Sequence, residues 1–137
     1  MKTFEFKLAT PENVLVEEDV EMVVVPGIDG NIGVLENHAP TITNLRPGLL
    51  TIFKDKKVLS KIFVDGGVAE ITPTRCTALV TEGTPIEALD KKSLEIEIKN
   101  LMEDVADAQS AEEEKEIGKH LDVAQTKLME TLIHERL

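Results

Sequence analysis

The sequence predicts a β + α protein in two parts: an N-terminal antiparallel β-sandwich of about 8–10 short strands, residues 1–87, then a C-terminal antiparallel two-helix hairpin, residues 88–137. Three observations predict this. All six prolines, all four phenylalanines and seven of the eight glycines precede residue 88. Before this break the apolar residues alternate with polar ones, and after it they recur every three or four positions. The first period is typical of strands and the second of amphipathic helices.

The strands follow from alternation and from turn residues. Residues 4–8 alternate apolar and polar side chains, which predicts a half-buried first strand. Pro26-Gly27 is expected to end the third segment, and Asp55-Lys56 and Asp65-Gly66-Gly67 are typical of hairpin turns. No helix-length segment separates the strands, so a parallel βαβ architecture is not expected. Further extended segments are predicted at residues 14–16, 20–25, 33–35, 41–45, 49–54, 57–64, 68–72 and 76–81.

Two apolar stripes predict the helices of the hairpin. Ser110-Ala111-Glu112-Glu113 matches the S-x-x-E capping box, which predicts the start of the second helix. Two stripes joined by a short connection predict antiparallel helices that cover each other's apolar faces. Three further apolar residues, Met129, Leu132 and Ile133, exceed this seam and are expected either on the sandwich or on a partner. The stripes are Leu94, Ile98, Leu101, Val105 and Ala108, then Ile117, Leu121, Ala124 and Leu128.

Charge and composition exclude several classes of protein. With 26 acidic and 15 basic side chains the net charge is −11, which argues against a nucleic-acid binder, as does the absence of Trp and Tyr. One cysteine, Cys76, cannot form an internal disulfide, and no Cys/His set has the spacing of a zinc site. No apolar run is long enough to cross a bilayer, and no signal peptide is expected.

The residues do not predict an active site. Gly27, Gly30 and Gly33 form a G-x-x-G-x-x-G run that leads into a strand, so they are interpreted as turn positions rather than a phosphate loop. His38 lies in a loop without a second catalytic group, and a loop hydrogen bond or partner contact is favoured. Cys76 follows a strand pattern and is expected in the core. We therefore expect no catalytic residue, no metal site and no cofactor.

Three motifs follow one another along the chain: residues 23–40 read VVVPGIDGNIGVLENHAP, residues 45–50 read LRPGLL, and residues 63–71 read FVDGGVAEI. Together and in this order they resemble the epsilon subunit of the F-type proton-translocating ATP synthase. The resemblance extends over the whole chain in order, including its length and the sequence of a β-domain and a hairpin. It points to a bacterial protein, because the N-terminus has no basic, Ser-rich presequence.

The resemblance implies a non-catalytic rotor subunit of the central stalk, peripheral to the cytoplasmic face of the bacterial inner membrane. Its sandwich would bind the gamma subunit and the membrane ring of c subunits, and so couple proton-driven ring rotation to ATP synthesis. The loop that carries the first motif would make much of the ring contact. The expected contact residues are Asp29, Asn31, Glu36 and His38.

In this family the C-terminal hairpin can fold against the sandwich or extend into the catalytic alpha/beta head and inhibit ATP hydrolysis. In relatives, basic helix residues contact an acidic segment of the catalytic beta subunit. Residues 88–137 carry 13 acidic and 7 basic side chains, so we expect weaker inhibition here than in relatives with basic tails. Gly118 is interpreted either as a weak point of the second helix or as a site of close helix approach. The cations expected to contact the head are Lys115, Lys119, Lys127 and Arg136.

Many bacterial relatives bind ATP through an [IL]-D-x-x-R-A motif at the start of the first helix. Here Asp90 is retained, while Ser93 and Leu94 replace the Arg and the Ala. The guanidinium that would hold a phosphate is missing, so nucleotide binding is expected to be weak or absent.

Two alternatives from other classes stay open on the sequence alone. One is a small-ligand-binding or sugar-binding sandwich with the hairpin as a dimerisation element, although only four Phe are available as aromatic platforms. The other is an independent enzyme, which lacks a convergent set of acid, base and nucleophile.

Overall fold

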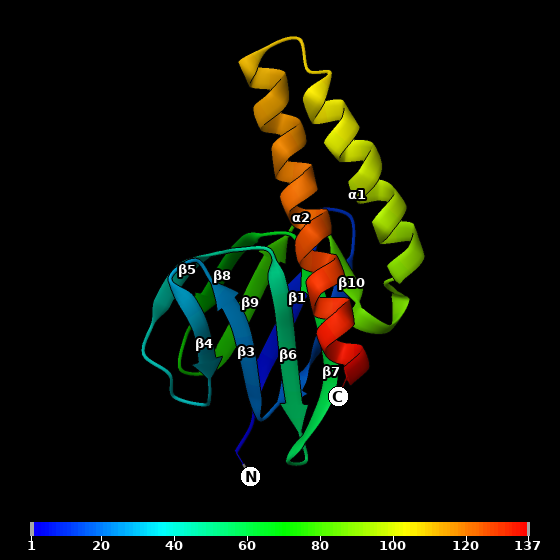
Figure 1. The fold of residues 1–137 in the computed structure, drawn as a ribbon. Helices are drawn as coiled ribbons and strands as arrows, with labels where there is room; N and C mark the ends of the chain where they lie inside the picture. Colours follow the sequence, from blue (N-terminus) through cyan, green and yellow to red (C-terminus); the bar gives the residue numbers. More distant parts are fainter. Residues whose placement is uncertain (1, 137) are drawn as a thin grey trace. The chain divides into compact units, whose positions relative to one another are not determined.

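The computed structural model describes residues 2–136, and within them it has ten strands, one 3-10 turn and two α-helices (Figure 1). The chain divides into two compact units, residues up to Pro85 and residues from Ile86 onward. The predicted fold class, a β-sandwich followed by a helical hairpin, is confirmed. The composition break after residue 87 lies inside the 3-10 turn η1 (Ile86–Ala88), which belongs to the second unit.

The strands form one sheet that folds over on itself, with β3, β6 and β7 in one layer and β1, β8 and β9 in the other (Figure 1). The order is β10-β7-β6-β3-β5-β8-β9-β1-β2, and β4 pairs with β3. All pairs are antiparallel except β1 with β9, which are parallel. The strands are β1 (Phe4–Ala9), β2 (Val14–Val20), β3 (Met22–Gly27), β4 (Gly30–Val34), β5 (Thr41–Leu45), β6 (Gly48–Lys54), β7 (Lys57–Val64), β8 (Gly67–Ile71), β9 (Arg75–Val80) and β10 (Gly83–Pro85).

Strand β3 runs through the predicted stop at Pro26-Gly27. Its first residues, Met22 to Val24, pair with β6, and its last residue, Gly27, pairs with Leu45 of β5. Pro26 lies where β3 passes from one neighbour to the other, so its missing N–H costs no ladder hydrogen bond on that side. Its carbonyl oxygen accepts a 2.9 Å hydrogen bond from the backbone N–H of Arg46.

The core between the two layers consists of the residues that face inward, which are every second residue along each strand. Phe6, Leu8, Leu50, Ile52 and Val64 are completely buried. Full burial of a side chain of this size stabilises a fold by about 1.5–3 kcal/mol relative to exposure. The alternation of apolar and polar side chains therefore fixes which face of each strand points inward. A slip of one residue in the strand register would expose all the apolar side chains of that strand.

Gly67 is the tightest backbone position in the sandwich. It has φ of +135°, and a Cβ atom there would lie 2.1 Å from the carbonyl oxygen of Leu79. It pairs with Leu45 on one side and with Val80 on the other. Only glycine has both the backbone freedom and the small size that this contact between β5, β8 and β9 requires.

The second unit is a hairpin of α1 (Lys91–Ala106) and α2 (Ala111–Arg136), which pack along each other. The predicted capping box is present in part. The backbone N–H of Glu113 donates to Ser110 Oγ at 3.1 Å, but the Glu113 carboxylate accepts from the N–H of Gln109 rather than of Ser110. No helix within residues 2–136 is long and apolar enough to cross a membrane.

Asp90 is the N-cap residue that precedes helix α1, and its carboxylate caps the helix. Oδ2 of Asp90 accepts hydrogen bonds from the Ser93 hydroxyl at 2.6 Å and from the Ser93 backbone N–H at 3.1 Å. These bonds, with the nearby Lys92 charge, lower the pKa of Asp90 below its usual value. Ser93, which stands where the family motif has Arg, therefore completes a helix cap.

Gly118 is not a site of close helix approach, since a Cβ there would meet nothing within 4 Å. That interpretation is wrong, and the weak point remains. We expect Gly118→Ala to stabilise α2 by about 1 kcal/mol, because alanine loses less backbone entropy in a helix. Slower amide exchange along α2 would demonstrate this stabilisation.

Gly67→Ala is a control with the opposite expected sign. It should destabilise the sandwich by about 3 kcal/mol or more. Faster amide exchange along α2 in Gly118→Ala would contradict the predicted stabilisation of α2.

The cap predicts a pH dependence of helix α1. The pKa of Asp90 is lower in the folded state, so the ionised carboxylate stabilises α1 above the unfolded-state pKa, and this is lost as the pH falls through the folded-state pKa. We expect Asp90→Ala to speed exchange of the Ser93 amide at neutral pH, and the difference from the unsubstituted chain to vanish in strong acid. Asp90→Asn, which keeps an accepting oxygen, serves as control. A difference that is constant across pH would refute the role of the charge.

Candidate functional site

The β3–β4 hairpin presents a sharp tip, which we define as Gly27 to Asn31. Gly27 pairs with Gly30 across a two-residue turn formed by Ile28 and Asp29. A Cβ at Gly27 would lie 2.7 Å from the carbonyl oxygen of Gly30, and Gly30 has φ of +138°, so the turn needs both glycines. The side chain of Ile28 is 58% exposed, although its backbone N–H is tied to Asn44 O at 2.9 Å. The tip is thus an exposed surface on a fixed backbone.

Arg46 holds the tip from the side of β5. Its guanidinium donates through Nη1 to the carbonyl oxygen of Gly27 and through Nη2 to Asn31 Oδ1 at 2.7 Å. Two residues later, Gly48 allows β6 to pass close to Pro26, whose Cβ would lie 3.1 Å from a Cβ at Gly48. The Arg-Pro-Gly motif therefore contacts the last residues of β3 and the tip of the β3–β4 hairpin.

The loop that follows β4, residues 36–40, carries Glu36 and His38. Asn37 has φ of +66° and donates its N–H to Pro73 O at 2.8 Å, which fixes the bend. His38 Nδ1 lies 2.7 Å from Ala39 O, and since a carbonyl only accepts, Nδ1 carries the proton and Nε2 is left for another contact. Glu36 is half-buried, and its Oε2 has no hydrogen-bond partner among the described residues.

The four predicted contact residues form two groups rather than one site. Asp29 and Asn31 lie at the tip, before or at the start of β4, whereas Glu36 and His38 follow its end. A strand of five residues spans roughly 15 Å. A single small partner group would not touch both, while an extended partner surface would.

The sequence did not reveal an apolar row on the outer face of β5, β8 and β9. Ile42, Val68 and Leu79 are 73%, 38% and 56% exposed, and they come from three neighbouring strands. Val68 is paired directly with Leu79, and Ile42 lies diagonally across from Val68, whose partner on β5 is Asn44. We call these three residues the outer row.

Leu79 lies between two surface hollows. One, of about 220 Å³, is lined by Ile42, Val68, Glu70, Thr77 and Leu79. The other, of about 330 Å³, is lined by Ala9, Thr10, Pro11, Gly67, Leu79, Val80 and Thr81. The surface around Leu79 is therefore uneven, with concave regions that a partner of complementary shape could fill.

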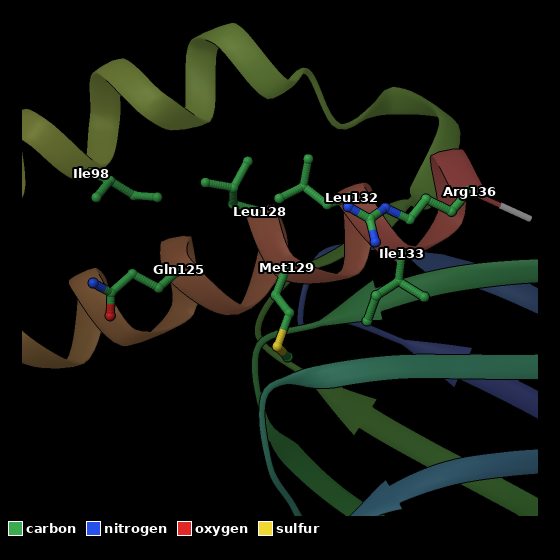
Figure 2. A pocket seen from close by; sticks show the side chains of 7 residues that line it. All are labelled: Ile98, Gln125, Leu128, Met129, Leu132, Ile133 and Arg136. Carbon is green, nitrogen blue, oxygen red and sulfur yellow. The ribbon is translucent and has the colours of Figure 1, made fainter.

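The hairpin has an apolar groove of about 490 Å³. Figure 2 shows Ile98 of α1 and Leu128 and Leu132 of α2 pointing into the space between the helices, while Met129 points to the other side of α2. Met129, Leu132 and Ile133 remain 51%, 36% and 48% exposed. The groove is lined by Ile98, Gln125, Leu128, Met129, Leu132, Ile133 and Arg136.

The four cations predicted to contact the head are not gathered on one face of α2. At about 100° per residue, Lys119 lies roughly 40° from Lys115, Lys127 about 120° away, and Arg136 about 60° in the opposite direction. Arg136 lines the apolar groove instead. No single basic stripe results from these four residues.

The groups with catalytic potential are inert or isolated. Cys76 is completely buried in β9, and burial raises the pKa of its thiol to about 12, which removes the thiolate needed for nucleophilic attack. Within residues 2–136 no three His, Cys, Asp or Glu side chains are grouped to hold a metal ion.

The sequence patterns did not predict two features of the site, the Arg46 hydrogen bonds and the outer row. Arg46 reaches residues 15 and 19 positions away, which no local pattern encodes. The outer row was detectable in part: Leu79 stands between Ala78 and Val80, both buried, so alternation assigns it to the outer face. The three exposed residues are neighbours only because the strands lie in the order β5-β8-β9.

Comparison with known proteins identifies the family. Residues 3–85 match the model of the ATP synthase delta/epsilon chain β-sandwich domain. The ATP synthase epsilon chain of Rhodospirillum centenum is 46% identical over 129 residues, which cover 90% of this chain and 88% of that protein. The epsilon chain of Rhodospirillum rubrum is 37% identical over 127 residues, covering 93% and 95%.

Two solved structures have a similar fold. One is the Euglena gracilis mitochondrial ATP synthase, OSCP/F1/c-ring, with a TM-score of 0.81, 18% identity and coverage of 96% of this chain and 82% of that chain. The other is the central stalk/c-ring of the Tetrahymena thermophila mitochondrial ATP synthase, with a TM-score of 0.64, 14% identity and coverage of 95% and 97%. At these identities the likeness concerns the fold.

The family model and the relatives confirm the resemblance seen in the three sequence motifs, and they favour a synthase subunit over a small-ligand-binding sandwich or an independent enzyme. The chain belongs to the ATP synthase delta/epsilon family, as an epsilon chain, a non-catalytic subunit of the synthase.

Proposed function

We propose that this subunit binds the gamma subunit through the outer row and meets the membrane ring of c subunits through the tip and residues 36–40. It turns with the central stalk and so passes ring rotation to the catalytic head. It is a peripheral subunit on the cytoplasmic face of the bacterial inner membrane. The solved relatives, which come from a central stalk/c-ring and an F1/c-ring assembly, support this assignment.

The outer row is the observation that carries the proposal. Single exposed aliphatic residues are common on protein surfaces, but adjacent ones on three paired strands form a contiguous patch that favours a partner. Such a patch needs a permanent, largely apolar partner surface, and the gamma subunit is the stalk component with which an epsilon subunit would turn as one body. Glu70 and Thr77 at the hollow's edge supply a polar rim.

The tip suits the ring for a different reason. Residues 28–31 are exposed; Asp29 and Asn31 are polar, and Ile28 at the turn is the one large apolar side chain. Polar rim contacts of this kind set orientation more than affinity, which fits a surface that must keep its register on the polar loops of a rotating ring. Asp29 and the Nε2 atom of His38 are the groups that we expect to meet those loops directly.

The hairpin is proposed as the regulatory segment, residues 88–137. The four cations expected to contact the head are dispersed around α2, and the segment carries 13 acidic side chains against 7 basic ones, so contact with an acidic surface of the head should inhibit hydrolysis only weakly. The Asp90 carboxylate is engaged by Ser93, which supports weak or absent nucleotide binding at this position.

The gamma surface can be tested with a charge in the outer row. Leu79→Asp should weaken binding to the gamma subunit by about 2 kcal/mol, or about 30-fold, because it buries an unpaired carboxylate between two hollows. Titration of the purified gamma subunit with the variant would measure the affinity. The matched control is Leu59→Asp on β7, where the leucine is 49% exposed but lies outside the row. Equal affinities for both variants would exclude the outer row as the gamma surface.

The ring surface can be tested at the turn. We expect Ile28→Asp to weaken the contact about tenfold and to lower proton pumping per ATP hydrolysed in the reconstituted synthase. Val58→Asp on β7, at a valine that is 48% exposed, is the matched control. Pumping that is unchanged in Ile28→Asp, with normal incorporation of the subunit, would show that the tip does not meet the ring.

A further inference from the structure

We infer that Arg46 is a positioning residue for the ring contact: its guanidinium holds the tip in the conformation that the ring meets, and Asn31 acts as its partner rather than as a direct ring contact. The inference rests on the proposed ring surface. The inference changes the role of Asn31, which was expected to contact the ring directly. It also adds Arg46, which lies outside the motif at residues 23–40.

The hydrogen bonds around Arg46 carry the inference. Nη1 donates to Gly27 O on the incoming strand, and Nη2 donates to Asn31 Oδ1 at 2.7 Å on the outgoing strand. One planar group thus bridges both sides of the turn that contains Ile28 and Asp29. Two parallel donors in a fixed fork restrain orientation, whereas a lysine ammonium would restrain distance only.

Two backbone hydrogen bonds tie the end of β3 and the start of the turn to residues 44 and 46 independently of the guanidinium. The backbone N–H of Arg46 donates to Pro26 O at 2.9 Å, and the N–H of Ile28 donates to Asn44 O at 2.9 Å. Both bonds survive a change of the Arg46 side chain. Substitution at Arg46 should therefore loosen the turn without separating β3 from β5, which makes positioning distinguishable from folding.

The Asn31 side chain is already engaged. Its Oδ1 accepts from Arg46, so it is turned toward the guanidinium. Among the described residues Arg46 has no carboxylate within ion-pair distance. An Asn31→Asp substitution would supply one, and it should preserve the bridge as a charge-assisted pair.

The first experiment measures the tip itself. Amide exchange of residues 27–31 should become about threefold to tenfold faster in Arg46→Gln, with exchange in β8 and β9 unchanged. Asn31→Ala should act similarly, the double variant should be no worse than either single one, and Asn31→Asp should exchange like the unsubstituted chain. The control is Arg75→Gln, which removes an exposed arginine that lies 3.6 Å from Glu5. Unchanged exchange at the tip in Arg46→Gln would overturn the inference.

The second experiment uses the complete synthase in vesicles. Arg46→Gln should lower proton pumping per ATP hydrolysed while gamma binding and the thermal midpoint stay the same, Arg46→Lys should fall between, and Asn31→Asp should retain pumping. Pumping that falls in Ile28→Asp but not in Arg46→Gln overturns the positioning role alone. Pumping that is unchanged in both variants refutes the proposed ring surface, and the inference falls with it.

Discussion

The close contact of Gly67 with the carbonyl of Leu79 is the constraint on which the rest of the sandwich depends. Gly67 pairs with Leu45 and with Val80, so it holds β8 between β5 and β9 at a spacing that no Cβ would allow. Its neighbour Val68 is the middle residue of the outer row. Leu45 directly precedes Arg46, whose guanidinium bridges the tip. Both proposed surfaces therefore depend on one backbone approach.

Much of the fold was predictable because it is locally encoded. Thr41–Leu45 and Lys57–Val64 were predicted with their observed bounds, since alternation and turn residues delimit them. The short β10 and the turn η1 were missed, because three residues carry too little pattern. The parallel pairing of β1 with β9 joins residues about 70 positions apart, which alternation cannot encode.

The site was less predictable than the fold for the same physical reason. Its elements come from separate parts of the chain: the tip from one hairpin, its brace from Arg46, and the outer row from three strands. The motif at residues 23–40 suggests a single contact loop, but the length of β4 separates Asp29 and Asn31 from Glu36 and His38. The sequence motif identified the segment that carries the proposed contact surface. The strand pairing determined which residues of that segment lie next to one another.

The tip of the sandwich and helix α2 of the hairpin carry opposite local features, and these suit the proposed tasks of the two units. A surface that transmits torque must not yield, and the tip is braced by Arg46 and by backbone bonds to Asn44 and from Arg46 to Pro26. A regulatory hairpin must instead exchange between arrangements of similar free energy. Gly118, with open space around it, weakens α2 without any packing benefit. Under the proposed function, a braced tip would transmit torque, and a hairpin with a weak point in α2 would change its arrangement more readily.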